Sequence, residues 1–159
     1  LAHRDSIRSL GGPFYPAQVL DDWAHGLAAN VYIRAMKRDE VFFVATGTID
    51  GTESVLGFAS DYRREGSTHG TSVYVRGAAA RRGIGSALFR HAEAHALANG
   101  ATSLEIEASL AGVDFYTTHG FVEIGRGETR LKSGRPIACV FMRKTWNRAG
   151  RSRAGAGPL

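Results

Sequence analysis

Residues 73–100 read VYVRGAAARRGIGSALFRHAEAHALANG, and this stretch decides the fold of the chain. A short apolar strand leads into a loop of small residues with Arg81, Arg82 and two glycines, and a helix over 83–99 follows. The first N–H groups of a helix have no intrahelical partner, and the helix dipole adds partial positive charge at the same end. A phosphate matches both features, and glycine lets it approach the backbone closely. The stretch therefore predicts an anion site at the start of this helix.

Three kinds of phosphate-binding loop compete for this pattern. A P-loop requires GxxxxGK followed by Ser or Thr, and the sequence has no such run. A dinucleotide fingerprint requires GxGxxG; Gly83 and Gly85 match it, but Leu88 fills the third glycine position. Glu105 lies about 20 residues on, as that fingerprint asks, yet too little sequence follows for a doubly wound domain. An ordinary glycine-rich helix start is the plain alternative.

The third kind of loop belongs to an acetyltransferase family. The run ARRGIGSALF resembles the acyl-CoA-binding motif of the GNAT N-acetyltransferases, Gln/Arg-x-x-Gly-x-Gly/Ala. Two further segments match in order: the strand VYV before the loop, and ASLAGVDFYTTHGF at 108–121, which is similar to the family's Asn-x-x-Ala-x-x-Phe-Tyr-x-x-x-Gly-Phe. The resemblance covers roughly residues 40–146. It implies a mixed α/β (α+β) fold whose mostly antiparallel central sheet is flanked by helices.

The sequence departs from the family pattern at four positions. Ala80 stands where the family usually has Gln or Arg, and Gly77 where it often has Pro. Ser109 replaces the usual Asn and Gly112 the usual Ala, and a serine donates one hydrogen bond where asparagine offers two. The main-chain amides of 81–86 still fit a pyrophosphate, so we expect CoA binding to persist.

The resemblance also implies a role for each part of the site. The strand around Tyr74 and Val75 pairs its backbone with the pantetheine arm, and the Val75 N–H polarises the thioester carbonyl where two parallel strands splay. Tyr116 matches the family's tyrosine acid, whose phenol is protonated at neutral pH; the alternative is that it only packs beside Phe115. The implied acetyl-CoA contacts are Tyr74, Val75, Arg81, Arg82, Gly83, Ile84, Gly85, Ser86, Ser109 and Phe115.

The motifs leave the general base open. Glu107 lies near the end of a predicted strand, next to the expected thioester, and is the first candidate for a catalytic base. His69 has a suitable ordinary pKa and is the second candidate. Asp61 and Glu65 belong to the polar segment 61–70, which we predict to be a loop with solvated side chains.

No metal site is predicted. His91 and His95 are spaced i, i+4 on the predicted helix, but no third ligand is suggested nearby, so they are interpreted as helix surface. The single cysteine, Cys139, lies in the apolar run IACVFM and is predicted to be a buried structural thiol. One cysteine and no signal peptide favour a reducing, cytoplasmic location. No run of about 18 apolar residues suggests a membrane span.

The chain of 159 residues is long enough for one domain with a real core, which we place at 1–146. Residues 147–159 carry three arginines and no acid, and their composition predicts a flexible tail. Nucleic-acid binding through this tail is an alternative, although three arginines make a small footprint. The predicted helices span 1–10, about 16 onward, 27–37, 83–99 and part of 108–120; the predicted strands are 41–46, 55–60, 71–75, 103–108, 121–131 and 136–146.

The family begins with a strand before its first helix, so we expect that strand to be missing from this chain. Phe14, Trp23 and Tyr32 are expected either to line the acceptor cleft or to pack in the core. The sequence thus predicts an acyl-CoA-dependent N-acyltransferase, a monomer or homodimer, that moves acetyl from acetyl-CoA to a primary amine. The amine belongs to a small molecule, a peptide N-terminus or a lysine. The alternative is a module of the same fold that senses acyl-CoA without turnover.

Overall fold

The structure is a computed structural model that describes residues 1–146; the predicted basic tail at 147–159 lies outside the described residues. The elements in chain order are α1 (Ala2–Gly11), α2 (Ala17–His25), α3 (Ala29–Met36), β1 (Val41–Ile49), β2 (Thr52–Arg63), β3 (Thr68–Val75), the 3-10 turn η1 (Gly77–Ala79), α4 (Ile84–Ala98), β4 (Ser103–Ser109), the 3-10 turn η2 (Leu110–Gly112), α5 (Val113–Thr118), β5 (Val122–Arg130) and β6 (Pro136–Thr145).

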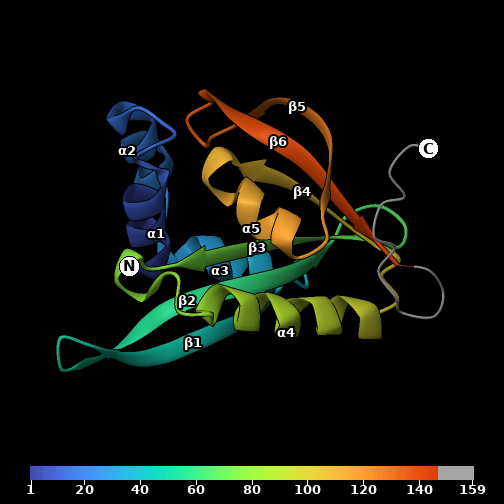
Figure 1. The fold of residues 1–159 in the computed structure, drawn as a ribbon, viewed down its shortest axis with the longest axis horizontal. Helices are drawn as coiled ribbons and strands as arrows, with labels where there is room; N and C mark the ends of the chain where they lie inside the picture. The colour runs from blue at the N-terminus through green and yellow to red at the C-terminus, as the bar shows by residue number, and fades with distance from the viewer. Residues whose placement is uncertain (147–159) are drawn as a thin grey trace.

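The six strands form one sheet in the order β1-β2-β3-β4-β6-β5 (Figure 1). Every neighbouring pair is antiparallel except β3 and β4, which run parallel. These two strands pair only at Thr68 with Ser103 and at His69 with Leu104, and then diverge (Figure 1). The predicted mixed, mostly antiparallel sheet flanked by helices is confirmed. The divergence of β3 and β4, called the splay below, leaves a gap in the middle of the sheet.

Helix α4 covers one face of β1, β2 and β3. Its predicted buried stripe is confirmed at Leu88, Ala92 and Ala96, because these residues pack on the sheet at helical spacing. Phe89 is fully buried as well, although the i, i+4 pattern does not include it. Its ring belongs to the core cluster that residues of β4, α5 and β6 form. Ile84, predicted in the same stripe, is only partly buried.

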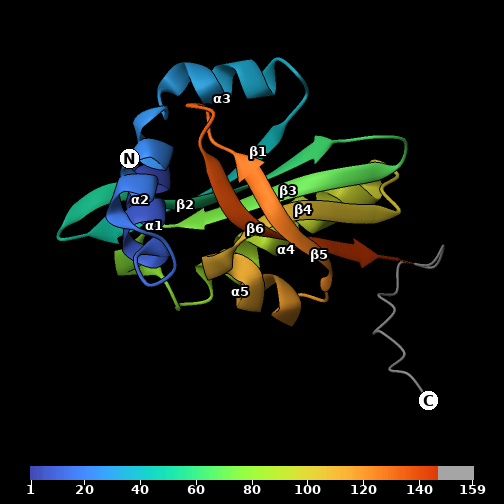
Figure 2. The same cartoon turned by 90° about the horizontal axis from the view of Figure 1, so that it is seen from above.

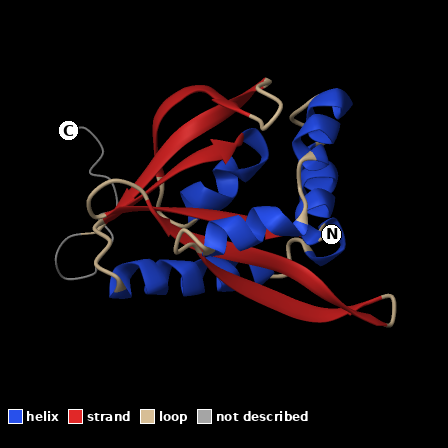
Figure 3. Cartoon of the chain, turned by 180° about the vertical axis from the view of Figure 1, so that it is seen from behind, coloured by secondary structure: helices blue, strands red, loops and turns tan. Residues whose placement is uncertain are grey.

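The N-terminal helices cover the opposite face and one end of the sheet. In Figure 2, α1 and α2 stack across the end at which β3 and β4 have diverged. Figure 3 views the molecule from behind, and there α3 crosses in front of the strands. Aromatic rings of β1 to β3 pack under these helices: Phe58 lies edge-on to Tyr32 of α3, with 5.9 Å between ring centroids, and beside Tyr74 at 5.4 Å. This face carries much of the aromatic core.

The segment 61–70 was predicted as a polar loop, and this prediction is wrong. Strand β2 continues to Arg63 and β3 begins at Thr68, so only four residues form the turn. Alternation along the strands places Asp61 and His69 on the face that α4 covers, where both are almost completely buried. Glu65 lies in the turn and is exposed, as predicted. Polarity indicated a loop here, but the buried Asp61 carboxylate is paired with the imidazoles of His69 and His95.

Strand β2 has both a bulge and a close backbone approach near Gly57. Leu56 is the extra residue of a bulge in β2, because Ala45 pairs with Gly57 while Thr46 pairs with Val55. A Cβ at Gly57 would lie 2.6 Å from the carbonyl oxygen of Tyr74. Within residues 1–146 no helix is both long and apolar enough to cross a membrane.

Candidate active site

The loop before α4 presents several backbone N–H groups in a row. Gly83, the N-cap of α4, has φ +80° and Arg81 has φ +59°, so two left-handed residues turn the chain into the helix. No side chain caps this helix end, and the first helical N–H bond runs from Ala87 to the Gly83 carbonyl, 3.0 Å away. The amides of 84–86 thus precede the first bonded donor. Such a concave run of amides at a helix N-terminus suits an anion.

Helix α1 fixes the entry to this loop. The Gly77 N–H donates to Asp5 Oδ1 at 2.7 Å, and Arg76 Nε lies 4.0 Å from the same oxygen. A Cβ at Gly77 would approach Ser9 Cβ to 2.6 Å, so the close packing of α1 on the turn requires glycine. The loop is therefore anchored by a helix far away in sequence.

Backbone groups of β3 face the gap that β4 leaves. The Arg76 N–H donates to the Leu56 carbonyl of β2 at 2.8 Å, and backbone groups alternate sides along a strand. The N–H groups of Val75 and Val73 therefore point away from β2, toward the splay. Tyr74, which pairs with Phe58, turns its backbone toward β2. The predicted free Val75 amide is in position for a ligand.

One cleft of about 1010 Å³ begins at the anion loop, passes through the splay and ends between α1, α2 and the β5–β6 hairpin. The predicted residues that line it are Tyr74, Val75, Arg81, Gly83, Gly85, Ser86, Glu107, Ser109, Phe115 and Tyr116. Arg82 and Ile84 do not line it; Arg82 is exposed, and the Ile84 side chain packs against the core under α4. Their proposed part in anion binding rests on their backbone amides and stays a prediction.

Tyr116 lies at the floor of the cleft. Its ring packs edge-on against Phe115 and Phe121, with centroid distances of 5.2 Å to each, and a Cβ at Gly112 would approach it to 3.3 Å. Burial raises the pKa of the Tyr116 phenol far above its ordinary value, and Tyr74 and Tyr62 add to this, while a backbone hydrogen bond at Val73 opposes it. The phenol is therefore a proton donor at neutral pH and well above it.

Glu107 is held in the cleft wall by an arginine. Arg64 Nη2 donates to Glu107 Oε1 at 3.1 Å, and Nη1 of the same guanidinium donates to the Glu105 carbonyl at 3.1 Å. Burial lowers the pKa of Arg64, but the hydrogen bond and charge of Glu107 outweigh it, and the net shift is upward. No local pattern indicates Arg64 in this role, because 43 residues separate it from its partner.

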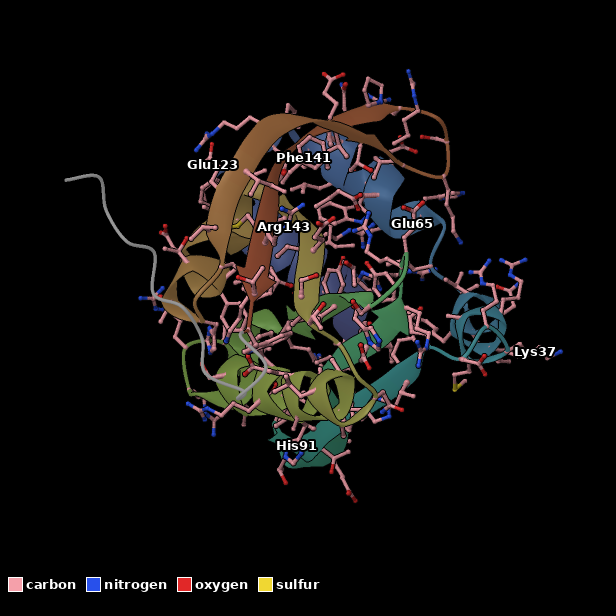
Figure 4. All side chains as sticks on the ribbon, turned by 90° about the vertical axis from the view of Figure 1, so that its right-hand side faces the viewer. Lys37, Glu65, His91, Glu123, Phe141 and Arg143 are labelled. Carbon is pink, nitrogen blue, oxygen red and sulfur yellow. The ribbon has the colours of Figure 1, made fainter. Side chains whose placement is uncertain are left out.

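His69 and Asp61 lie outside the cleft. Asp61 bridges two imidazoles: its Oδ1 lies 2.7 Å from Nδ1 of His69 and its Oδ2 lies 2.7 Å from Nδ1 of His95. The prediction of His69 as a candidate base is wrong in this structure, because its ring is buried against α4. His95, which was interpreted as helix surface, is one of the two imidazoles that bind Asp61. His91 stacks on Phe43 of β1, with 5.9 Å between ring centroids. Figure 4 labels His91 at this edge of the molecule.

The described residues contain no cluster of three or more His, Cys, Asp or Glu side chains placed to hold a metal ion. The predicted absence of a metal stays a prediction. Cys139 is buried as expected, and burial raises the pKa of its thiol. It also lines the cleft, which its apolar neighbours in sequence did not indicate.

Aromatic residues of the N-terminal segment line the end of the cleft opposite the anion loop. Phe14 and Trp23 line this end, which agrees with the first of the two predicted alternatives, that they line the acceptor cleft. Tyr15 lines it as well. Tyr32 does not line the cleft; it packs on Phe42 and Phe58 instead. Tyr15 is a further cleft residue that no pattern indicated, since only its neighbour Pro16 carries a helix-start signal.

The sequence matches the family described as "Acetyltransferase (GNAT) domain" over residues 15–146. The chain belongs to this GNAT family. The GNAT fold inferred from the three motifs is therefore confirmed. Among curated proteins none matches the sequence.

Solved structures of other GNAT proteins share the fold. A GCN5-related N-acetyltransferase from Rhodopseudomonas palustris, titled "Aminotransferase, Class-II", is 25% identical with a TM-score of 0.74, covering 91% of this chain and 86% of its own. The ribosomal-protein-alanine N-acetyltransferase of Brucella melitensis is 27% identical with a TM-score of 0.58, covering 78% and 83%. The PaiA N-acetyltransferase of Thermoplasma acidophilum, in complex with coenzyme A, is 17% identical with a TM-score of 0.67, covering 91% and 89%.

Proposed function

We propose that this GNAT domain is an N-acetyltransferase that moves acetyl from acetyl-CoA to a primary amine by direct attack. The observation that carries the proposal is a single cleft in which the anion loop, the free Val75 N–H and the Tyr116 phenol follow one another. Two structural neighbours support the choice of cosubstrate: the Thermoplasma protein holds coenzyme A, and YncA of Salmonella typhimurium holds acetyl-CoA.

The reaction assigns one task to each part of the cleft. The amides of 81–86 and Arg81 bind the pyrophosphate, and the side of β3 that faces the splay binds the pantetheine arm. The Val75 N–H donates to the thioester oxygen, where negative charge develops as the amine attacks. The new C–N bond forms, the C–S bond breaks, and sulfur leaves with the electron pair. Tyr116 donates a proton to this thiolate, and the amine loses one proton.

Glu107 is the carboxylate that we assign to receive the amine proton, directly or through a water molecule. It lines the cleft, and Arg64 fixes its position. Of the other predicted candidates, His69 and Asp61 are buried away from the cleft, and Glu65 lies in an exposed turn. The assignment of residues 1–146 as one catalytic domain, a cytoplasmic location, and a monomeric or homodimeric state belong to this proposal.

A second function uses the same site without turnover. Ala80 lines the cleft where the family usually has a long polar side chain, and Ser109 offers fewer hydrogen bonds than asparagine. Both changes favour a domain that binds acyl-CoA as a sensor. The buried, protonated Tyr116 favours the enzyme, because a sensor has no need of a proton donor at the sulfur.

Binding is tested first, by calorimetric titration of the purified chain with acetyl-CoA and, separately, with CoA. We expect saturable binding that Gly83→Trp abolishes, because Gly83 lines the cleft at the anion loop. Gly51→Trp is the matched control: Gly51 lies in the β1–β2 turn with φ +77°, close to the +80° of Gly83, and a Cβ at either position meets no atom within 4 Å. A folded protein that does not bind acetyl-CoA would refute both functions.

Transfer is then measured as CoA release with a panel of amines. Tyr116→Phe and Glu107→Gln should each lower kcat by about 100-fold, the low end for a lost general acid or base. Glu105→Gln is the control for Glu107, since Glu105 lies two residues earlier on β4 and also pairs with an arginine, Arg143, at 2.7 Å. Binding without release for any amine would favour the sensor. An unchanged rate in Tyr116→Phe would remove the acid role.

A further inference from the structure

The end of the cleft that receives the amine has a definite chemistry, and this inference rests on the proposed function. We infer that the acceptor is a primary monoamine that carries a hydrophobic group of aromatic size, rather than a polyamine or an aminoglycoside. Three observations carry it: the apolar walls of this end, the pairing of the acids around it, and a single carboxylate beside the reacting centre.

The walls of this end come from two helices, the connection between them and one hairpin, and they are mostly apolar. Helix α1 supplies Leu10, the α1–α2 connection supplies Phe14, α2 supplies Trp23, and the β5–β6 hairpin supplies Leu131 and Ile137. Phe14 remains 49% exposed and Leu10 38% exposed, so both present apolar surface to the open cleft. Burying such surface against a ligand is favourable, whereas a chain of charged amines would lose its hydration here.

The walls are held together before any ligand binds. Lys132 Nζ of the β5–β6 hairpin donates to the Gly26 carbonyl after α2 at 3.0 Å, and Figure 1 shows the hairpin turn beside α2. A pocket whose sides are tied in this way loses little conformational entropy when a hydrophobic group enters it.

Two acids of α2 beside this end are engaged with cations. Asp21 of α2 pairs with Arg8 at 3.2 Å. Asp22 accepts from Ser133 at 2.6 Å and from Arg135 at 2.9 Å, and these bonds hold the pKa of its carboxyl below the ordinary value. A polycation would find these carboxylates already paired.

Only two carboxylates line the described part of the cleft. Asp114 precedes Phe115 on α5, at the anion-loop end, and Glu107 lies in the middle. Within residues 1–146, Arg130 is the only charged side chain of the acceptor walls, and it donates to the Gly134 carbonyl at 2.7 Å. One carboxylate near the reacting centre and one cation in the wall match a single ammonium group and repel further positive charge.

The acceptor then binds with its hydrophobic group between Phe14, Trp23 and Leu131 and its nitrogen toward Glu107. Because the acceptor enters as an ammonium group, it first loses one proton to solvent; the neutral amine then attacks the acetyl carbon of acetyl-CoA, and Glu107 takes the second proton as the amide bond forms. The sulfur leaves and is protonated by Tyr116, so the products are an N-acetylamine and CoA.

The experiment compares three amines at saturating acetyl-CoA: 2-phenylethylamine, ethylamine and spermidine. We expect kcat/KM for 2-phenylethylamine to exceed that for each of the other two by about 10-fold or more, as burial of an aromatic ring predicts. A preference for spermidine, or equal values for all three, would overturn the inference and leave the proposed function intact. Failure to bind acetyl-CoA in the titration above would remove both.

Two variants test the walls. Phe14→Ala should lower the ratio of kcat/KM between 2-phenylethylamine and ethylamine by about 5-fold, because part of the hydrophobic contact is lost. Leu10→Glu adds a carboxylate and should raise the relative rate with spermidine. Ile33→Ala is the control, since Ile33 is also half exposed but lies on α3 outside the cleft. If Phe14→Ala and Ile33→Ala give the same ratio, the aromatic wall does not select the amine.

Discussion

At the scale of single residues, the buried carboxylate of Asp61 is the most constrained group outside the cleft. Its two oxygens each face an imidazole Nδ1 at 2.7 Å. The Asn99 amide nitrogen lies 3.3 Å from Nε2 of His95, which must therefore accept and leave the proton on Nδ1. Both histidines donate to Asp61, which satisfies a charge that would otherwise be costly to bury.

Asp61→Asn should destabilise the domain although the side chain keeps its size. An amide has one acceptor oxygen and an NH2 group, so one imidazole N–H would face another donor. We expect the free energy of unfolding to fall by about 1–3 kcal/mol, the cost of an unsatisfied buried group. Urea unfolding measures this. Glu65→Gln is the matched control, because it neutralises an exposed acid in the same segment; an equal effect of the two changes would contradict the network.

At the scale of elements, Tyr15 connects the N-terminal helices to the far half of the sheet. Its hydroxyl donates to the Ala138 carbonyl of β6 at 2.7 Å and accepts from the Leu110 N–H, just after β4, at 2.8 Å. Because the ring is buried, one phenol positions α1 and α2 against both strands that wall the cleft. Burial, the largest influence, raises the pKa of this phenol, so it remains a donor.

Tyr15→Phe should act on the amine rather than on acetyl-CoA. Both hydrogen bonds are lost, α1 and α2 are less firmly placed, and the KM for the amine should rise about 10-fold, as loss of one to two kcal/mol of positioning predicts. The KM for acetyl-CoA should stay constant. Steady-state kinetics with each substrate varied give the two values. Tyr32→Phe, which removes a phenol that lies 3.0 Å from His3 outside the cleft, is the control; the same KM shift there would show a general loss of stability.

The positions of helices, strands and turns were predictable where a local sequence pattern specifies them. The residues that line the cleft were predictable where they belong to a motif. The turns at Asp50-Gly51 and Ser133-Gly134, both with left-handed residues, and the start of α4 at Gly83 follow from glycine and neighbouring periodicity. The prediction of a loop at 61–70 was wrong because polar residues that are buried together, such as Asp61 and His69, hid the alternation of buried and exposed positions in β2 and β3. The roles of Arg64 and Tyr15 and the pairing of His95 with Asp61 were not predicted, because contacts over 34 to 123 residues have no local signal.

At the scale of the whole molecule, the two halves of the sheet meet around three tyrosines. Burial is the first cause that raises the pKa of Tyr62 on β2, Tyr74 on β3 and Tyr116 on α5. The charge of each would also disfavour ionisation of its neighbours, since Tyr62 acts on Tyr74 and both act on Tyr116. The region around the splay thus contains phenols that stay neutral at neutral pH.

This coupling predicts a steep loss of stability in alkali. An unfolded tyrosine ionises near about pH 10, while these three keep their protons in the folded state, so the folded chain binds more protons above that pH. Their contribution is complete below about pH 10. Beyond it, stability falls by about 1.4 kcal/mol per pH unit for each tyrosine that is still protonated in the folded state and ionised in the unfolded state. Urea unfolding at rising pH, with tyrosinate absorbance as a second signal, measures the slope. Tyr74→Phe should reduce the slope by one tyrosine's share, whereas Tyr32→Phe, at a less buried ring, should change it less. Ionisation of all tyrosines in a still folded protein near about pH 10 would contradict the prediction.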